Sequence, residues 1–177
     1  MKREALAVGT KKIALLVEEL YNEFEFWYPY YRMKEAGFDV VVVGSGTQKV
    51  YRGKYGIPAE AEVDAGDVQP SRFDAVIIPG GYAPDRMRIC RGMLEIVREL
   101  FAAGKTVAAI CHGGWVLISA GVVKGRRATG CPMIKDDLVN AGAEFLDQEV
   151  VVDENLITSR IPDDLPAFCR EIIRKLS

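Results

Sequence analysis

A cysteine followed by a histidine and two glycines is the pattern in this sequence best suited to chemistry. Cys111, His112, Gly113 and Gly114 follow the apolar run 107–110. We expect that run to be a buried parallel strand and residues 115–120 to begin a helix, which places Cys111 at the strand's carboxyl end. Open α/β sheets bind ligands at that end, and helix N-termini favour a thiolate. The pattern predicts a nucleophilic cysteine, with a buried structural cysteine as the alternative.

A nucleophilic cysteine needs hydrogen-bond donors for the oxyanion that it creates. Gly80 and Gly81 follow the preceding apolar run, 75–78, and glycine allows the backbone to approach a ligand closely. One of their amides, paired with the amide of His112, would form an oxyanion hole, and Gly113 is a further candidate for substrate binding. The alternative is an ordinary strand-to-loop turn.

The proton partner of Cys111 is harder to identify, because His112 is the only histidine. We expect its side chain to leave the turn in a different direction from that of Cys111. Glu25, at the start of the first predicted helix, is the best carboxylate candidate, since burial would favour its acid form and let it shuttle a proton. A solvated glutamate is the alternative. Its rivals for the role are Glu18, Glu19 and Glu23.

His112 would work as a base if a carboxylate oriented it. Asp85 is the candidate, in the run Ala83, Pro84, Asp85. Proline followed by aspartate equally suits the first turn of a helix, where the aspartate would answer the helix dipole.

The composition fits a single domain of 177 residues, with residues 1–11 as a short, loosely ordered extension. Hydrophobic residues make up 49%, and 23 basic against 25 acidic side chains give a net charge of -2, which does not indicate nucleic acid or an anionic membrane as a partner. The N-terminus does not resemble a signal peptide, and no apolar run approaches the roughly 20 residues of a membrane helix. We therefore expect a cytoplasmic protein.

The cysteine spacing predicts free thiols rather than a metal site. Cys90, Cys111, Cys131 and Cys169 are widely scattered, and no pair has the spacing of a zinc knuckle or of Cys-x-x-Cys. With a single histidine in a cytosolic setting, we expect no metal, no cofactor and no disulfide framework.

Strand and helix patterns alternate along the chain. This alternation predicts an α/β fold, a mostly parallel sheet with helices on both faces. The predicted strands are 12–17, 38–44, 75–78, 107–110 and a short one near Ala128, with a hairpin of 150–152 and 156–158. The predicted helices are 23–36, 93–103, 115–120, 135–141 and a last one that runs to Lys175 with Asp163 as its cap.

Five segments together resemble the ThiJ/PfpI family of intracellular proteases and stress proteins, in the class I glutamine amidotransferase-like superfamily. They are 25–29, 79–81, 109–113, 134–137 and 159–160, in consistent order from about Lys12 to the C-terminus. The resemblance implies a flavodoxin-like three-layer sandwich with Cys111 on a nucleophile elbow, hydrogen-bonded to Glu25. It also implies a homodimer or hexamer with the active site near a subunit interface.

In protease-like members of that family, a glutamate from the neighbouring subunit completes the Cys/His pair. Asp85 occupies its position here, and the shorter side chain weakens the case for peptide hydrolysis. A second departure is Cys131, where many relatives have an aromatic residue. It would be a resolving thiol if it approached Cys111, but an inert packed cysteine is the favoured interpretation.

The resemblance implies a cysteine-nucleophile enzyme that attacks an electrophilic carbonyl group. Its substrate would be a 2-oxoaldehyde or glycated adduct, as for a glyoxalase or deglycase, or a peptide bond, as for protease I. We favour the small carbonyl substrate. The alternative is a non-enzymatic stress protein in which peroxide oxidises Cys111 to a sulfinic acid stabilised by Glu25.

Overall fold

The centre of the molecule is a seven-stranded sheet, seen in a computed structural model that describes residues 10–177. The predicted N-terminal extension, 1–11, falls almost wholly outside the described residues. All neighbouring strands are parallel except β10 and β11, which form the predicted hairpin. In spatial order the strands are β10 (Val150–Asp153), β11 (Leu156–Ser159), β7 (Thr106–Ile110), β6 (Ala75–Ile78), β1 (Lys12–Val17), β2 (Asp39–Gly44) and β5 (Val63–Asp64).

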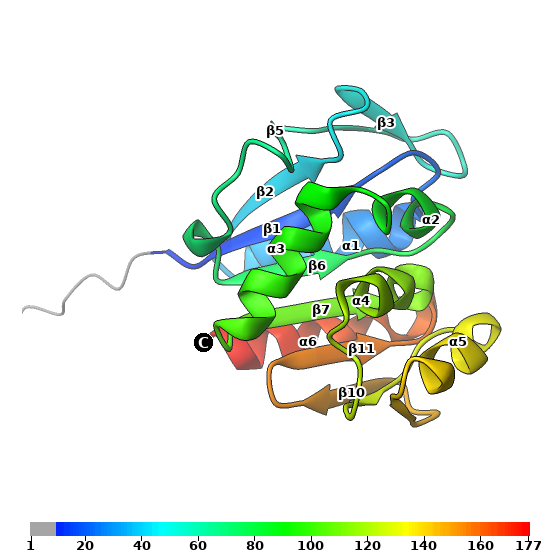
Figure 1. The fold of residues 1–177 in the computed structure, drawn as a ribbon. Helices are drawn as coiled ribbons and strands as arrows, with labels where there is room; N and C mark the ends of the chain where they lie inside the picture. The colour runs from blue at the N-terminus through cyan, green and yellow to red at the C-terminus, as the bar shows by residue number, and fades with distance from the viewer. Residues whose placement is uncertain (1–9) are drawn as a thin grey trace, which may run out of the picture.

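Helices cover both faces of this sheet, which confirms the predicted three-layer sandwich (Figure 1). One face carries α1 (Glu23–Glu35) and α6 (Leu165–Leu176), and the other carries α2 (Ala83–Met87), α3 (Arg91–Ala102) and α4 (Gly114–Ala120). Strands β6 and β7 are buried along their whole length, as their continuous apolar sequences predict. No helix within residues 10–177 has the length and apolar character needed to cross a bilayer.

Smaller elements complete the chain outside the main layers. Strands β3 (Val50–Arg52) and β4 (Pro58–Glu60) form an antiparallel ladder, and β8 (Arg127–Ala128) pairs in parallel with β9 (Glu144–Phe145). Helix α5 (Lys135–Asn140) packs against α4.

The predicted cap of the last helix is wrong. Asp163 lies in a 3-10 turn, Pro162–Asp164, and α6 begins after Asp164. The Asp164 carboxylate does not cap the helix, because Arg160 engages it through Nε at 2.9 Å and Nη2 at 3.2 Å. A charge-assisted pair has displaced the cap that a helix-start aspartate would otherwise form.

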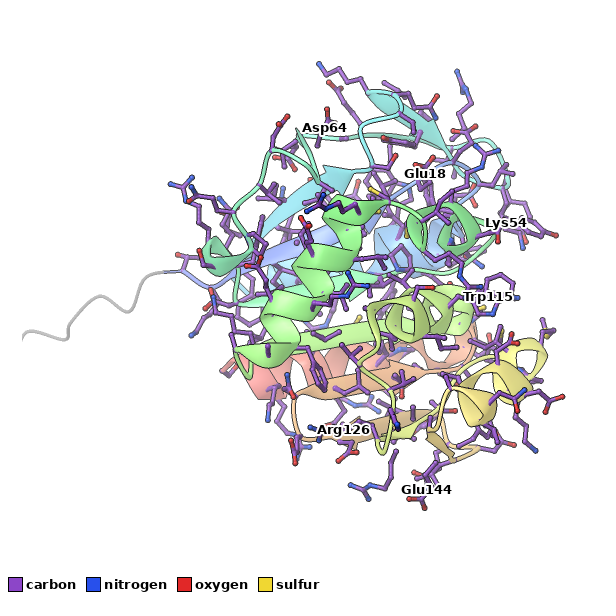
Figure 2. The ribbon with its side chains drawn as sticks, viewed as in Figure 1. Glu18, Lys54, Asp64, Trp115, Arg126 and Glu144 are labelled. Atoms are coloured by element: carbon purple, nitrogen blue, oxygen red, sulfur yellow. The ribbon has the colours of Figure 1, made fainter. Side chains whose placement is uncertain are left out.

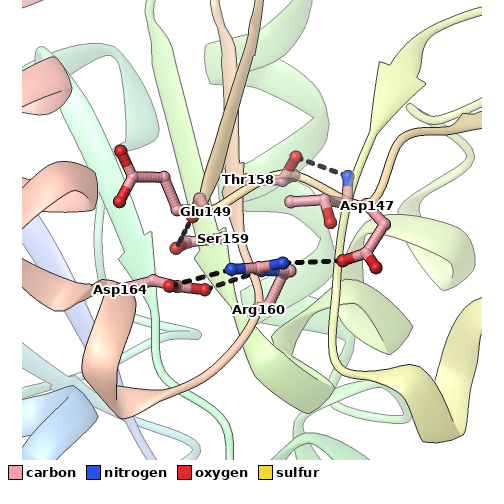
Figure 3. A network of polar contacts seen from close by, with 7 residues as sticks. Asp147, Glu149, Thr158, Ser159, Arg160 and Asp164 are labelled. Atoms are coloured by element: carbon pink, nitrogen blue, oxygen red, sulfur yellow. Dashed lines mark hydrogen bonds and ion pairs between the residues drawn. The ribbon is translucent and has the colours of Figure 1, made fainter.

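The Ser159–Arg160 motif therefore has a structural role (Figure 3). Arg160 also donates from Nη1 to Asp147 at 2.7 Å, and the Ser159 hydroxyl donates to the Glu149 carbonyl. These contacts tie the end of β11 to the segment before β10 and to the start of α6.

Helix α1 is attached to the end of β6 by its N-cap, Asn22. Asn22 Oδ1 accepts hydrogen bonds from the amides of Phe24 at 3.1 Å and Glu25 at 3.4 Å. Its own amide donates to the Gly80 carbonyl at 3.1 Å. The cap was not predicted, although an Asn followed by acidic residues is a known helix-start signal.

Removing this cap should destabilise the protein. Replacing Asn22 by alanine should lower the free energy of unfolding by about 1 kcal/mol, because two first-turn amides lose their acceptor. Asn22→Ser, which keeps a capping oxygen, should recover most of that loss. Urea unfolding of the three proteins would measure the difference, and equal stability of Asn22→Ala and the parent would contradict a capping role.

Candidate active site

Cys111 lies on a tight turn between β7 and α4. Its φ is +58°, a value that few non-glycine residues adopt, and a 3-10 turn, Cys111–Gly113, leads directly into the helix. Gly113 is needed for this turn, because a Cβ there would lie 2.6 Å from the Ile78 carbonyl oxygen. The turn therefore packs against the end of β6 and leaves the Cys111 side chain partly exposed. This is the predicted nucleophile elbow.

Glu25 projects from the first turn of α1 and is wholly buried. Its Oε2 accepts a hydrogen bond from the Gly80 amide at 2.7 Å. The other oxygen, Oε1, is buried without a hydrogen-bond partner among residues 10–177. Burial, followed by the charge of the Cys111 thiolate, raises the pKa of Glu25 to about 9. The carboxyl is therefore protonated at neutral pH and is able to donate a hydrogen bond or a proton.

Gly80 is the point where α1, β6 and the Cys111 turn meet. A Cβ at this position would lie 2.5 Å from Glu25 Oε2, 2.9 Å from Cys111 Cβ and 3.0 Å from the His112 amide nitrogen. Only glycine allows the three segments to come this close. Asn22 binds the carbonyl of Gly80 while Glu25 binds its amide, so the start of α1 holds the Gly80 residue from both sides.

The side chain of His112 does not leave the turn in a different direction from Cys111, and that expectation is wrong. Its Nδ1 lies 3.3 Å from Cys111 Sγ, because the positive φ and the 3-10 turn bring consecutive side chains to the same side. The hydrogen bond with Cys111 raises the pKa of His112 above its ordinary value. The ring also packs edge-on against Trp115, with centroids 5.0 Å apart.

Cys131 approaches the same histidine from the loop before α5. It is fully buried, and its Sγ lies 3.3 Å from His112 Nδ1. A hydrogen bond between the two thiols, together with burial, raises the pKa of Cys111 to about 12, and the same hydrogen bond lowers the pKa of Cys131. This hydrogen bond therefore favours the proton on Cys111 and the thiolate form on Cys131.

The same three side chains are of the types that bind soft metal ions. Cys111 Sγ, Cys131 Sγ and the nearest His112 nitrogen all lie within 4.8 Å of one another. Thiolates and imidazole suit zinc or monovalent copper. The absence of a metal site, expected from the sequence, stays a prediction.

The amide of Gly81 is a candidate oxyanion donor. Tyr21 and Gly81 form an isolated antiparallel β-bridge. The hydrogen bonds of this bridge are donated by the amides of Asn22 and Tyr82, so the Gly81 amide is not used in it. His112 is the second residue of a helical turn, where an amide has no acceptor within the turn. The Gly80 amide is already engaged by Glu25. Of the predicted donors, Gly81 and His112 therefore suit an oxyanion better than Gly80 does.

The three other glutamates considered as proton partners form hydrogen bonds with the segment around β3 and, in the described part of the chain, not with Cys111. Each is bound elsewhere, and within residues 10–177 none has a hydrogen bond to Cys111. Glu18, at the carboxyl end of β1 (Figure 2), accepts from the Ser45 hydroxyl, Glu19 accepts from the Arg52 amide at 3.0 Å, and Glu23 accepts from the Tyr55 amide at 2.7 Å.

Asp85 is exposed in the first turn of α2, and its carboxylate has no hydrogen bond or ion pair within residues 10–177. A role for Asp85 toward His112 would require a neighbouring subunit. The sequence did not indicate Lys54, whose positive charge partly offsets the rise in the pKa of His112 that the Cys111 hydrogen bond causes. Lys54 and Trp115 both lie at the carboxyl end of the sheet (Figure 2). Lys54 lies in a turn-rich segment that gave no signal of chemistry.

The protonated state of Glu25 should appear in the pH dependence of stability. Its folded pKa of about 9 lies above the ordinary value of 4.5, so the folded form retains a proton that the unfolded chain releases. The stabilisation is complete below about pH 4.5 and is lost as the pH rises toward 9, by up to about 1.4 kcal/mol per pH unit. Glu25→Gln lacks this proton, so its stability should rise relative to the parent over this range. The measurement is the free energy of urea unfolding of both proteins between about pH 4.5 and 9. If the pKa of Glu25 were ordinary, this free energy would change with pH in the same way in both proteins.

Comparison with known proteins shows relatives over nearly the whole chain. The sequence is 45% identical over 165 residues to deglycase PfpI of Pyrococcus furiosus, covering 93% of this chain and 99% of the relative. It is 44% identical over 171 residues to protein/nucleic acid deglycase 2 of Escherichia coli, covering 94% and 98%. It is 43% identical over 169 residues to general stress protein 18 of Bacillus subtilis, again covering 94% and 98%.

Solved structures show the same fold. A two-domain protein of Anabaena variabilis with DJ-1/ThiJ/PfpI-like and ferritin-like domains has a TM-score of 0.92 at 45% identity, covering 94% of this chain and 48% of that one. DJ-1beta of Drosophila melanogaster has a TM-score of 0.89 at 28% identity, covering 94% and 90%. The profile of the DJ-1/PfpI family matches residues 11–175. Its sequence relatives and its fold agree, and this chain belongs to the DJ-1/PfpI family.

Proposed function

We propose that this protein is a cysteine-dependent enzyme that acts on 2-oxoaldehydes or their glycated adducts. The observation that carries the proposal is a buried, protonated carboxyl, Glu25, beside a partly exposed thiol, Cys111. Such a pair supplies both a nucleophile and a proton donor to a small carbonyl group. The two relatives named as deglycases support this class of substrate.

The reaction begins at Cys111. His112 Nδ1, at 3.3 Å, accepts the thiol proton, and the sulfur adds to the aldehyde carbon. The amides of Gly81 and His112 hold the resulting oxyanion, and Glu25 supplies it with a proton. In a glycated adduct, the sulfur takes the place of the amine, which leaves.

The second stage moves a proton between the two substrate carbons. Glu25, now ionised, removes the hydrogen from the carbon bonded to sulfur and returns it to the neighbouring carbon. The product is a thioester of a 2-hydroxy acid, which water hydrolyses to release Cys111. The substrate gains one water molecule, and the oxidation of one carbon balances the reduction of the other, so the sequence needs no redox cofactor.

Peptide hydrolysis fits this site less well. It depends on a histidine that a carboxylate orients, and Asp85 makes no such contact within residues 10–177. An attack on a small aldehyde uses Cys111 and Glu25, which the chain itself brings together. A peroxide-sensing stress protein is the second candidate, favoured by the partly exposed Cys111 and by the stress-protein name of one relative.

A second copy of this chain is the partner we propose. Aromatic side chains on α1 and the loop after β3 line an apolar hollow, and Phe24, Tyr31 and Tyr55 are each more than half exposed. Exposed apolar patches of this kind mark interaction surfaces. The patch lies on the same helix as Glu25, which is consistent with an active site near a subunit interface. We also propose that the protein works in the cytoplasm.

Turnover tests the proposed reaction. Wild type should convert methylglyoxal to lactate, Cys111→Ser should be inactive, and Glu25→Gln should lose about 10²- to 10⁴-fold in kcat. Cys90→Ser is the matched control, because its sulfur bonds to the Ser45 carbonyl instead of the site. A fluorogenic peptide is assayed in parallel. If wild type turned over neither substrate, or if Cys111→Ser were fully active, the enzymatic proposal would fail.

Two further variants test the role of a neighbouring subunit. His112→Ala should lower the rate of methylglyoxal conversion by at least about a hundredfold, because the sulfur loses its proton acceptor, whereas Asp85→Ala should cost less than about tenfold. Sedimentation of both variants shows whether the oligomer persists. An equally large loss in both, with the oligomer intact, would assign Asp85 to the mechanism.

A further inference from the structure

We propose that Cys131 is a resolving thiol, so that oxidation of Cys111 by a hydroperoxide ends in a Cys111–Cys131 disulfide. The inference rests on the oxidisable thiol of the proposed site, but it does not depend on carbonyl turnover. It differs from the sulfinic acid expected of a simple peroxide sensor, because the second sulfur intercepts the first oxidation product.

The geometry brings the two sulfurs together. Both Sγ atoms lie within 4.8 Å of each other, and His112 Nδ1 is 3.3 Å from each. A disulfide requires about 2.0 Å, so the sulfurs must close the remaining gap. Cys131 lies outside any strand or helix, between β8 and the 3-10 turn Pro132–Ile134, where a side-chain rotation does not break a ladder of hydrogen bonds. Closure therefore requires local movement only.

Exposure assigns a different role to each sulfur. Cys111 is partly exposed and is the sulfur that a peroxide meets, whereas Cys131 is fully buried and is shielded from direct oxidation. Hydrogen bonds from Cys111 and from the amides of Met133 and Ile134 lower the pKa of Cys131. The two amide contacts do not depend on the Cys111 thiol, so they still favour the Cys131 thiolate in the second step. Attack by a thiolate is the step by which disulfides form. The other two cysteines do not belong to this cluster.

The chemistry balances in two steps. His112 Nδ1 accepts the proton of the Cys111 thiol, and the sulfur attacks one oxygen of the hydroperoxide. The O–O bond breaks, and the remaining oxygen takes that proton from His112 and leaves as an alcohol or water. Cys111 is then a sulfenic acid. The Cys131 thiolate attacks its sulfur, the S–S bond forms and the S–O bond breaks. The departing hydroxide takes the proton of Glu25 and leaves as water, and Glu25 regains from solvent the proton that Cys131 released on ionising. Two thiols are thereby oxidised and one peroxide is reduced.

A disulfide would protect the site from permanent oxidation. A sulfinic acid is not reduced by ordinary thiols, whereas a disulfide is. Substrate turnover would stop while the disulfide is present, since Cys111 is not available as a nucleophile. A thiol reductant would restore it.

Peroxide oxidation followed by mass spectrometry tests the inference. Wild type, Cys131→Ser and Cys90→Ser are treated with hydrogen peroxide in the presence of a chelator, then alkylated and mapped without reduction. Wild type and Cys90→Ser should lose two hydrogens and yield a peptide pair linked through Cys111 and Cys131. Cys131→Ser should instead carry several-fold more sulfinic acid at Cys111. Alkylatable Cys131 beside a sulfinic acid at Cys111 in wild type would overturn the proposal.

A second measurement does not depend on the variant folding. After peroxide treatment, dithiothreitol should return both thiols of wild type to the alkylatable form, whereas persistent loss of Cys111 would contradict the disulfide. Carbonyl turnover of the reduced protein is recorded separately. Turnover without disulfide formation overturns only this inference, and disulfide formation without turnover overturns only the proposed enzymatic function.

Discussion

The active site depends on one contact, the hydrogen bond from the Gly80 amide to the buried carboxyl of Glu25. In a common capping box, a carboxyl at this helix position turns back to the amide of the N-cap residue. Here the amide of Asn22 binds the Gly80 carbonyl instead, which leaves the carboxyl to cross from α1 to the end of β6. The helix start, the strand end and the cysteine turn are thereby fixed relative to one another.

Burial gives that carboxyl its chemistry. Because water does not solvate Glu25, its acid form persists at neutral pH and faces a thiol that is still reachable from solvent. Cys131 and His112 supply a second set of contacts to Cys111. Cys111 therefore contacts both a proton donor, Glu25, and a pair of groups that accept its proton or hydrogen-bond to it. This arrangement suits both carbonyl addition and reversible oxidation.

Sequence patterns predicted the main strands and the place of Glu25, because continuous apolar runs and a helix at the sheet's carboxyl edge leave few alternatives. The family and the three-layer fold were also predicted. The direction of the His112 side chain was not, since it depends on the positive φ of Cys111. Neither was the approach of Cys131, because a loop's path is set by tertiary packing rather than by periodicity. The electrostatic influence of Lys54 on His112 depends on the same kind of long-range contact.

A direct titration of the Glu25 carboxyl tests the central claim that a protonated acid faces Cys111. Infrared difference spectra of wild type minus Glu25→Gln, recorded across the pH range, isolate the carbonyl stretch of this one group. We expect the protonated-acid band to persist through neutral pH and to disappear near pH 9. Loss of the band near the ordinary value of 4.5 would show an ionised carboxylate beside the thiol and would contradict the mechanism.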